Sequence, residues 1–126
     1  MRGIGFFLLA LACGPALGEW VEIVGTDDEV GTFFIDPATL QRFGDGMRWA
    51  WLMQDLKKAA EDGFLSYAGL FEFDCAKQRT RPIQTYFYAG HRTSGEVVKK
   101  TGDSTNWTQA LADTPAGRTL KFACAN

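Results

Sequence analysis

The sequence predicts an α+β domain: a single antiparallel β-sheet of about six strands, with a C-terminal α-helix packed on one face and one disulfide. Two patterns support this fold class. Short segments in which apolar and polar residues alternate are separated by turn residues, as in antiparallel sheets. The last segment differs in kind, because Leu120, Ala123 and Cys124 follow Pro115 at helical spacing.

The strands can be placed from the alternation. We expect them over residues 19–24, 32–36, 47–56, 64–75, 80–90 and 95–100. Between the second and third strands, Pro37 is expected to open a short helical turn over residues 37–42. Side chains alternate across a strand, so the odd-numbered apolar residues of the third and fourth strands are expected to meet in a common core. These residues are Met47, Trp49, Trp51 and Met53, and Leu65, Tyr67, Phe71, Phe73 and Cys75.

The N-terminal segment 1–18 is predicted to be a signal peptide, which leaves one domain over residues 19–126. One basic residue, Arg2, precedes a short apolar run, and the small residues Ala16 and Gly18 suit cleavage before Glu19. The run is shorter than the roughly 20 residues of a transmembrane helix. A second interpretation stays open: "ALAC" is a weak lipoprotein-type site, which would lipidate Cys13. We therefore expect an exported protein, in the periplasm or at the cell surface.

Cysteine usage agrees with export. Cleavage of the leader would leave two of the three cysteines, Cys75 and Cys124, in an oxidising compartment where pairing is expected. A bridge that closes a loop of about 50 residues contributes roughly 4 kcal/mol in the chain-entropy model. It would hold the C-terminal helix, which Thr114 can cap, against the sheet.

The stretch "FDCAKQRTRP" raises the question of a turn. If the strand ran straight through, Lys77, Arg79 and Arg81 would share a face with Cys75, and three cations would point toward the core. A turn around residues 76–78 avoids that cost. Pro82, which lacks a ladder donor, favours an edge or a bulge in the strand that follows.

The order of motifs resembles the surface-adhesin protein E family. The matching parts are "FFIDPATLQRFGDGMRWAWLMQDL", "FEFDCAKQRTRPIQTYFYAG" and "TPAGRTLKFAC". The resemblance implies a six-stranded antiparallel sheet with a packed helix, a Cys75–Cys124 bridge and export by a Gram-negative bacterium. It also implies protein partners, since the family's namesake is a surface lipoprotein that binds host matrix proteins such as vitronectin and laminin and can dimerise. Because the lipidation site is weak here, the periplasm is the default expectation.

Six side chains are the candidates for contact with a partner. Arginine forks bind carboxylates and sulfates in bidentate fashion. Fifteen of the 17 aromatic residues follow residue 18, which is more than one face of a small sheet can bury. Phe34 and two tyrosines are therefore expected on the outer face of the sheet, where exposed aromatic residues often mark an interface. The alternative is that Asp74, Glu72 and Asp55 neutralise the cations internally. The candidates are Lys77, Arg79, Arg81, Arg92, Tyr86 and Tyr88.

Composition narrows the function classes. The formal net charge is −2, which argues against bulk attraction to nucleic acid or anionic membranes. His91 is the one histidine, so we expect no catalytic residues, no metal and no cofactor, although haem contact through His91, Tyr86 and Tyr88 stays open. We expect a non-enzymatic exported interaction module with a host matrix protein or a periplasmic protein as its partner, and a homodimer stays open. The alternatives are a periplasmic inhibitor that presents residues 89–95, "AGHRTSG", and a small hydrolase that uses His91.

Overall fold

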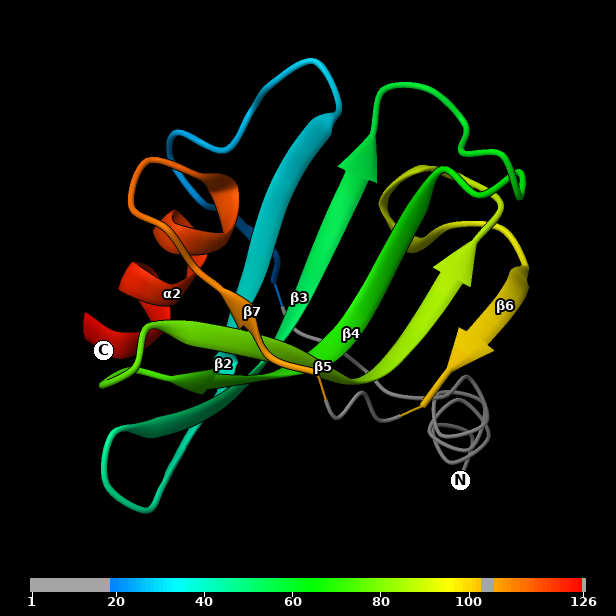
Figure 1. The fold of residues 1–126 in the computed structure, drawn as a ribbon. Coiled ribbons are helices and arrows are strands. Elements are labelled where there is room, and N and C mark those ends of the chain that lie inside the picture. The colour runs from blue at the N-terminus through cyan, green and yellow to red at the C-terminus, as the bar shows by residue number, and fades with distance from the viewer. Residues whose placement is uncertain (1–18, 103–105, 126) are drawn as a thin grey trace, which may run out of the picture.

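One antiparallel sheet and one C-terminal helix make up the fold (Figure 1). The computed structural model describes residues 19–102 and 106–125. In this part of the chain the sheet has seven strands in the order β1-β2-β3-β4-β5-β6, and the short strand β7 pairs with β5. The elements are β1 (Val21–Glu22), β2 (Gly31–Phe43), β3 (Met47–Leu56), β4 (Ser66–Asp74), β5 (Arg79–Tyr88), the 3-10 helix η1 (His91–Thr93), β6 (Val97–Thr101), β7 (Thr108–Gln109) and α2 (Pro115–Ala125).

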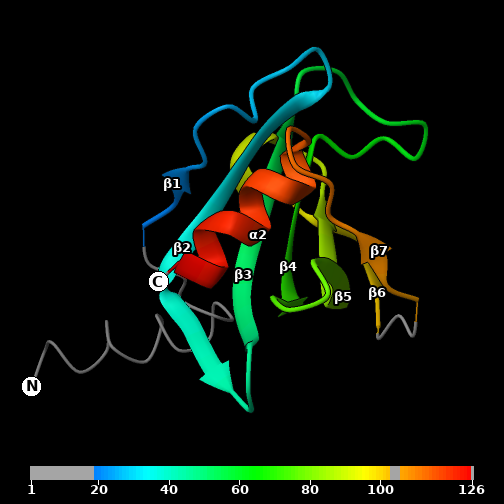
Figure 2. The same cartoon turned by 60° about the vertical axis from the view of Figure 1, so that its left-hand side comes forward.

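The main core lies between α2 and the sheet. Figure 2 shows α2 lying across the face formed by β2, β3 and β4. Leu120 and Ala123 of the helix pack there against Ile35, Leu52 and Phe73 of the sheet, all of them buried. Burial of a large apolar side chain contributes about 1.5–3 kcal/mol, so this layer supplies most of the hydrophobic stabilisation. The predicted fold class is confirmed.

The predicted common core of odd-numbered residues is wrong. Residues directly opposite one another in an antiparallel pair point to the same face. In β3 and β4 the opposite pairs are Trp51 with Leu70 and Met53 with Ala68, so odd-numbered residues of one strand face even-numbered residues of the other. Phe73 therefore faces α2, and Met53 belongs to a second cluster. The register between β3 and β4 decides which side chains share a face. Alternation within one strand does not reveal that register.

The predicted helical turn over residues 37–42 is also wrong, because β2 continues through Pro37. The register with β3 shifts between Asp36 and Gln41, which marks a bulge. Inside it, Thr39 Oγ1 donates to the carbonyl of Asp36 at 2.7 Å and accepts from the Trp51 N–H at 2.9 Å. This side chain replaces ladder bonds that the bulge disrupts, so the strand bends without breaking.

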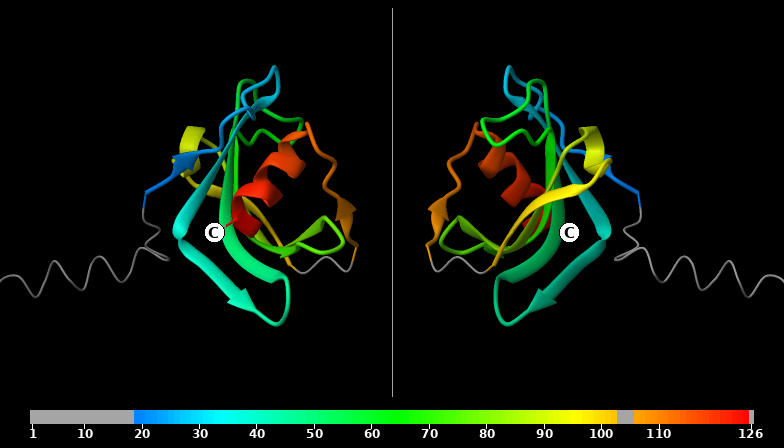
Figure 3. Two further views of the ribbon diagram at one scale, coloured as in Figure 1. Left: turned by 90° about the vertical axis from the view of Figure 1, so that its left-hand side faces the viewer. Right: turned by 90° about the vertical axis from the view of Figure 1, so that its right-hand side faces the viewer.

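A second bulge bends β4 and β5. The pairing shifts from Leu70 with Gln84 to Phe71 with Pro82, which leaves Ile83 as the extra residue. Pro82 was expected at an edge or a bulge, and the bulge is confirmed. Bulges increase local twist, and the sheet curls around α2 (Figure 3).

The C-terminal helix is capped and covalently tied. The Gly117 N–H donates to Thr114 Oγ1 at 3.1 Å, as expected for an N-cap threonine. Cys75, just after β4, forms a disulfide with Cys124, and the two Cα atoms lie 5.8 Å apart. The predicted bridge is confirmed. The predicted signal peptide and Cys13 lie outside the described residues, and within the described ranges no helix is long and apolar enough to span a membrane.

Candidate functional site

The face of the sheet opposite α2, which we call the outer face, carries most of the side chains suited to contact. One row of paired residues crosses five strands: Phe34, Met53, Ala68, Tyr86 and Lys100. No α-helix of the described chain packs on this face, and only the short 3-10 helix η1 covers one end of it. Its side chains form three groups: a basic end, an aromatic centre and a loop end.

The basic end is neutralised internally. Arg79 Nε donates to Asp74 at 3.0 Å, and Arg81 donates to Glu72 at 2.8 Å. Both guanidinium groups lie over the ring of Trp107, with their carbon atoms 4.4 and 4.7 Å from the centroid. Both carboxylates are buried, so these pairs serve the structure: removal of one partner would leave an uncompensated buried charge.

Asp74 is positioned to affect stability through pH. Burial by itself would raise its pKa, but the Lys77 N–H, at 3.2 Å, and the Arg79 guanidinium together hold the pKa of Asp74 below its ordinary value. A depressed carboxylate pKa contributes stability above the pKa of the unfolded chain, which is about 4, and that contribution is lost as pH falls through the folded-state value.

We therefore expect Asp74→Asn to lower the free energy of unfolding at pH 7 by about 1–3 kcal/mol. The difference from the native protein should persist down to about pH 4 and shrink below it, because only the native carboxylate titrates there. Urea denaturation from pH 7 to pH 3 measures this. Exposed Asp45, replaced by Asn, is the matched control and should change stability by less than about 0.5 kcal/mol. Parallel acid limbs for the native and Asp74→Asn proteins would contradict this role.

The aromatic centre surrounds a shallow hollow of roughly 440 Å³. Trp49, Trp51 and Leu70 line it, together with residues of the β2 bulge. Tyr86 flanks the hollow, with its ring centroid 6.3 Å from that of Trp51. All four side chains are partly exposed. Rigid aromatic rings that keep contact area in solvent are typical of binding surfaces.

The loop end is formed by residues 89–96, which join β5 to β6 and which we call the knuckle loop. Arg92 and Thr93 both have a left-handed backbone, with φ of 52° and 62°. Such conformations cost roughly 1–3 kcal/mol for residues other than glycine and persist only where the surroundings enforce them. Here the Arg92 N–H donates to Asp55 Oδ1 at 2.8 Å, and the Thr93 N–H donates to Ser66 Oγ at 2.8 Å. The loop therefore presents its side chains in a fixed arrangement.

Arg92 differs from the other two arginines. Its guanidinium lies over the ring of Phe34, 4.5 Å from the centroid, and the residue is exposed. Within the described part of the chain, no carboxylate forms an ion pair with it. The Phe34 ring itself is buried and packs with Met53 and Ala68, so the cation rests on a rigid platform. This end of the outer face therefore offers an oriented, unpaired guanidinium.

His91 lies in the knuckle loop beside Asp55 and Ser66. His91 Nδ1 lies 3.0 Å from Asp55 Oδ1 and the imidazole is exposed. Ser66, which pairs with Asp55 across the strands, is fully buried, and its hydroxyl donates to the Gly90 carbonyl at 2.7 Å. A serine held in this way is not available as a nucleophile. Within residues 19–102 and 106–125, no group of three or more metal-ligating side chains occurs.

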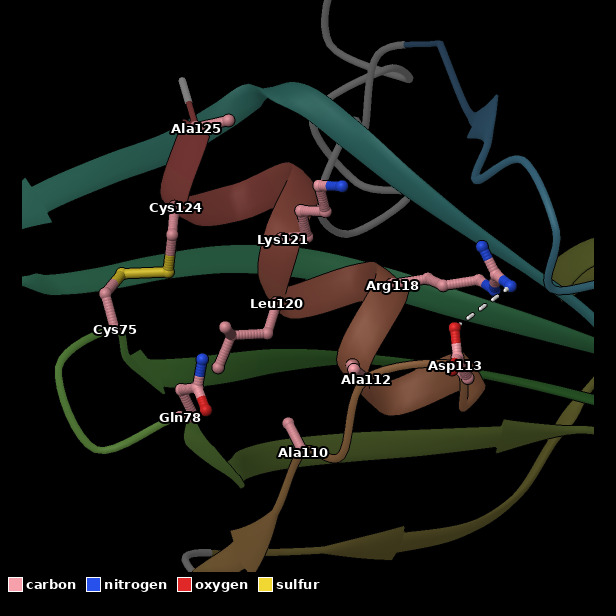
Figure 4. A pocket seen from close by; sticks show the side chains of 11 residues that line it. Cys75, Gln78, Ala110, Ala112, Asp113, Arg118, Leu120, Lys121, Cys124 and Ala125 are labelled. Atoms are coloured by element: carbon pink, nitrogen blue, oxygen red, sulfur yellow. Dashed lines mark ion pairs between the residues drawn. A yellow bond between two sulfur atoms is a disulfide. The ribbon is translucent and has the colours of Figure 1, made fainter.

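A second hollow of roughly 510 Å³ lies beside the disulfide on the helix side (Figure 4). Cys75 and Gln78 border it from the β4–β5 turn, and Leu120 and Cys124 border it from α2. Arg118 and Asp113, which also line it, form an ion pair at 3.9 Å. The hollow forms because the disulfide holds α2 at a distance from the β4–β5 turn.

The six sequence-predicted contact residues do not form one patch. The turn at residues 76–78 is confirmed, and it leaves Lys77 exposed. Arg79 and Arg81 lie at the start of β5, whereas Tyr86, Tyr88 and Arg92 lie at its far end. Sequence reasoning missed Trp107 as the platform of the basic end. Trp107 lies next to β7. Only two residues of β7 pair with β5, which is too few for the sequence to predict a strand there.

The fold defines a class: a small disulfide-bridged α+β domain in which one helix covers one face of a single antiparallel sheet. The chain belongs to the surface-adhesin protein E family, whose model matches residues 20–125. It is therefore an adhesin-like exported or surface protein with protein partners. No curated protein sequence matches it.

Solved structures of Haemophilus influenzae protein E share the fold. Crystal form II is 14% identical, with a TM-score of 0.67, over 90% of this chain and 94% of that chain. A further structure of that protein is 14% identical, with a TM-score of 0.66, over 90% and 91% of the two chains. Protein E from non-typeable Haemophilus influenzae is 14% identical, with a TM-score of 0.58, over 90% and 80%. At this identity the likeness concerns the fold alone.

Proposed function

We propose that this chain is a non-enzymatic interaction module that binds a carboxylate-bearing segment of a protein partner at the loop end of its outer face. The single observation that carries the proposal is the exposed Arg92 guanidinium, oriented over Phe34 by the strained knuckle loop and without an acidic partner in the described chain. Tyr86 and Tyr88 supply the flanking aromatic contacts. The partner class we favour is a host extracellular-matrix protein, in keeping with the adhesin family.

The Arg92 side chain is pre-organised for binding. A guanidinium can bind a carboxylate through two parallel hydrogen bonds, but a free arginine side chain loses rotamer freedom when it does so. The Phe34 ring already restricts Arg92, and the bonds from Asp55 and Ser66 fix its backbone. Arginine and tyrosine in such settings are the residues that most often dominate binding energy.

We expect Arg92→Ala to weaken partner binding by at least about 30-fold, which corresponds to roughly 2 kcal/mol. The measurement is biosensor binding of the full chain, expressed with its own leader and purified after export, to immobilised vitronectin and laminin. Lys121→Ala removes an exposed cation from α2, on the other side of the sheet, and should leave binding unchanged. An equal loss of partner binding in both variants would mean that net charge alone causes the effect, and it would contradict the assignment of Arg92 as the contact residue.

The double variant Arg79→Ala plus Arg81→Ala should behave differently. Both guanidinium groups are occupied by Glu72 and Asp74, so their removal strands two buried carboxylates and should lower stability. Partner binding by the fraction that stays folded should be largely retained. Loss of binding with unchanged stability would move the contact surface to the basic end.

A second candidate function is a periplasmic inhibitor or accessory protein that presents the knuckle loop to a bacterial partner. The rigid loop geometry favours it, since a loop with a fixed backbone loses little conformational freedom when a partner binds it. Pull-down against periplasmic extract separates the two. Retention of a bacterial periplasmic protein, lost in Arg92→Ala, with no binding to matrix proteins would favour this candidate.

We further propose that residues 1–18 are removed on export, leaving a domain of residues 19–126. Intact-mass measurement of the exported protein tests both processing routes. A mass that begins at Glu19 supports the periplasmic form, and a lipid-modified mass that begins at Cys13 supports a surface anchor.

A further inference from the structure

We propose that an apolar pocket beneath α2 binds a small uncharged aromatic molecule that carries one hydroxyl group. The pocket has a volume of roughly 190 Å³ and lies between the helix and the curled face of the sheet, next to β7. Its apolar walls come from both layers of the fold: Phe33, Leu52, Phe71, Phe73, Pro82 and Ala116.

The volume sets the size of the ligand. An apolar cavity of about 150 Å³ holds benzene, so this pocket suits one aromatic ring with a small substituent. The walls of an empty pocket lose dispersion contacts, which a bound ring would restore.

The polar groups of the pocket set the chemistry of the ligand. Thr80 Oγ1 donates to the Glu72 carbonyl at 2.9 Å, and Thr119 Oγ1 donates to the Pro115 carbonyl at 2.8 Å, so each hydroxyl keeps only its acceptor capacity toward the pocket. Tyr67, which is partly exposed, also lines the pocket, and its hydroxyl has no hydrogen-bond partner within the described chain. Burial raises the pKa of Tyr67 to about 12, and a tyrosine hydroxyl is already protonated and able to donate at neutral pH at its ordinary pKa of about 10.

The same walls exclude a charged ligand. Arg81 is the one charged residue that lines the pocket, and its guanidinium is already bound to Glu72 at 2.8 Å and stacked on Trp107. A carboxylate or an ammonium group would enter without a free counterion and lose its hydration. A neutral molecule with one hydroxyl matches the acceptors of Thr80 and Thr119 and the donor of Tyr67. The pocket lies on the face opposite the proposed partner-binding surface, so this inference is independent of the proposed function.

Phenol is the probe that tests the inference, with toluene and benzoate as comparisons. In NMR titrations of the full chain up to roughly 10 mM ligand, phenol should cause saturable shifts at Ala116 and Thr119, toluene weaker ones, and benzoate none. Tyr67→Phe should weaken phenol binding about fivefold and leave toluene binding unchanged, because only the hydroxyl is lost. Arg92→Ala, on the outer face, should bind phenol as the native protein does.

A pocket-filling variant provides the second arm. Ala116→Leu should abolish binding of both phenol and toluene, with circular dichroism confirming that the variant is folded. If that variant fails to fold, the ligand selectivity of Tyr67→Phe still decides the question. The inference is overturned if phenol shows no saturable shifts, if benzoate binds equally well, or if the shifts map to the outer face.

Discussion

Replacing Cys75 and Cys124 together by alanine should lower the free energy of unfolding by about 4 kcal/mol. The bridge joins residues 49 positions apart, and the chain-entropy model assigns roughly that value to a loop of this length. A small domain has only about 5–15 kcal/mol in total, so the variant should be close to unfolding at 37 °C. Urea denaturation of the exported native and variant proteins measures the difference.

Reduction supplies the control for this experiment. Dithiothreitol should lower the unfolding midpoint of the native protein toward that of the double variant, and it should leave the double variant unchanged. The loss should fall mainly on the contact of α2 with the sheet, because Cys124 lies in the last turn of that helix. An unchanged midpoint in the double variant would mean that the packing of Leu120 and Ala123 holds the helix without help.

Gly117→Ala should destabilise the fold by about 3 kcal/mol, against the usual sign for this substitution inside a helix. Alanine normally stabilises a helix by about 1 kcal/mol relative to glycine. At Gly117, however, an added Cβ would lie 1.9 Å from the Leu111 carbonyl oxygen and 2.6 Å from its carbon. That oxygen also accepts from the Thr114 N–H and hydroxyl, so it cannot move without breaking the helix cap.

Gly102→Ala is the matched control for this substitution. A Cβ at Gly102 meets nothing within 4 Å, so its effect should stay within about 0.5 kcal/mol. Thermal denaturation of the two variants checks the contrast. If Gly117→Ala proves neutral or stabilising, the loop that carries Leu111 must be able to yield, and the close approach of loop and helix would not be a constraint on the sequence.

On the outer face, ion pairing decides which arginines are available to bind a partner. From the sequence, Arg79, Arg81 and Arg92 are equivalent candidates for binding. In the fold, two of them are used to cover buried carboxylates, and only Arg92 is left exposed without an acidic partner in the described chain. Proximity in sequence placed the first two in one hairpin, but the distant Trp107 and the opposite residues of β4 decided what they do.

Local information determined much of this protein. The alternation of apolar and polar residues, the turn after Cys75, the Thr114 cap and the pair of cysteines predicted the strands, the hairpin, the C-terminal helix and the bridge. The strands, the hairpin and the helix each depend on residues that are close together in the chain, and the bridge depends on two cysteines that can pair only with each other. The family resemblance rests on the same stretches, and the family match confirms it.

The tertiary structure alone decided which side chains share a face and which charges are satisfied. The common core predicted from odd-numbered residues failed because register is a property of two strands, and a shift of one residue moves a whole set of side chains to the other face. Pro37 did not open a helical turn because Thr39 bonds to Trp51, twelve residues away, and keeps the segment in the sheet. Long-range partners override local preference where they satisfy the backbone, and no local pattern records them.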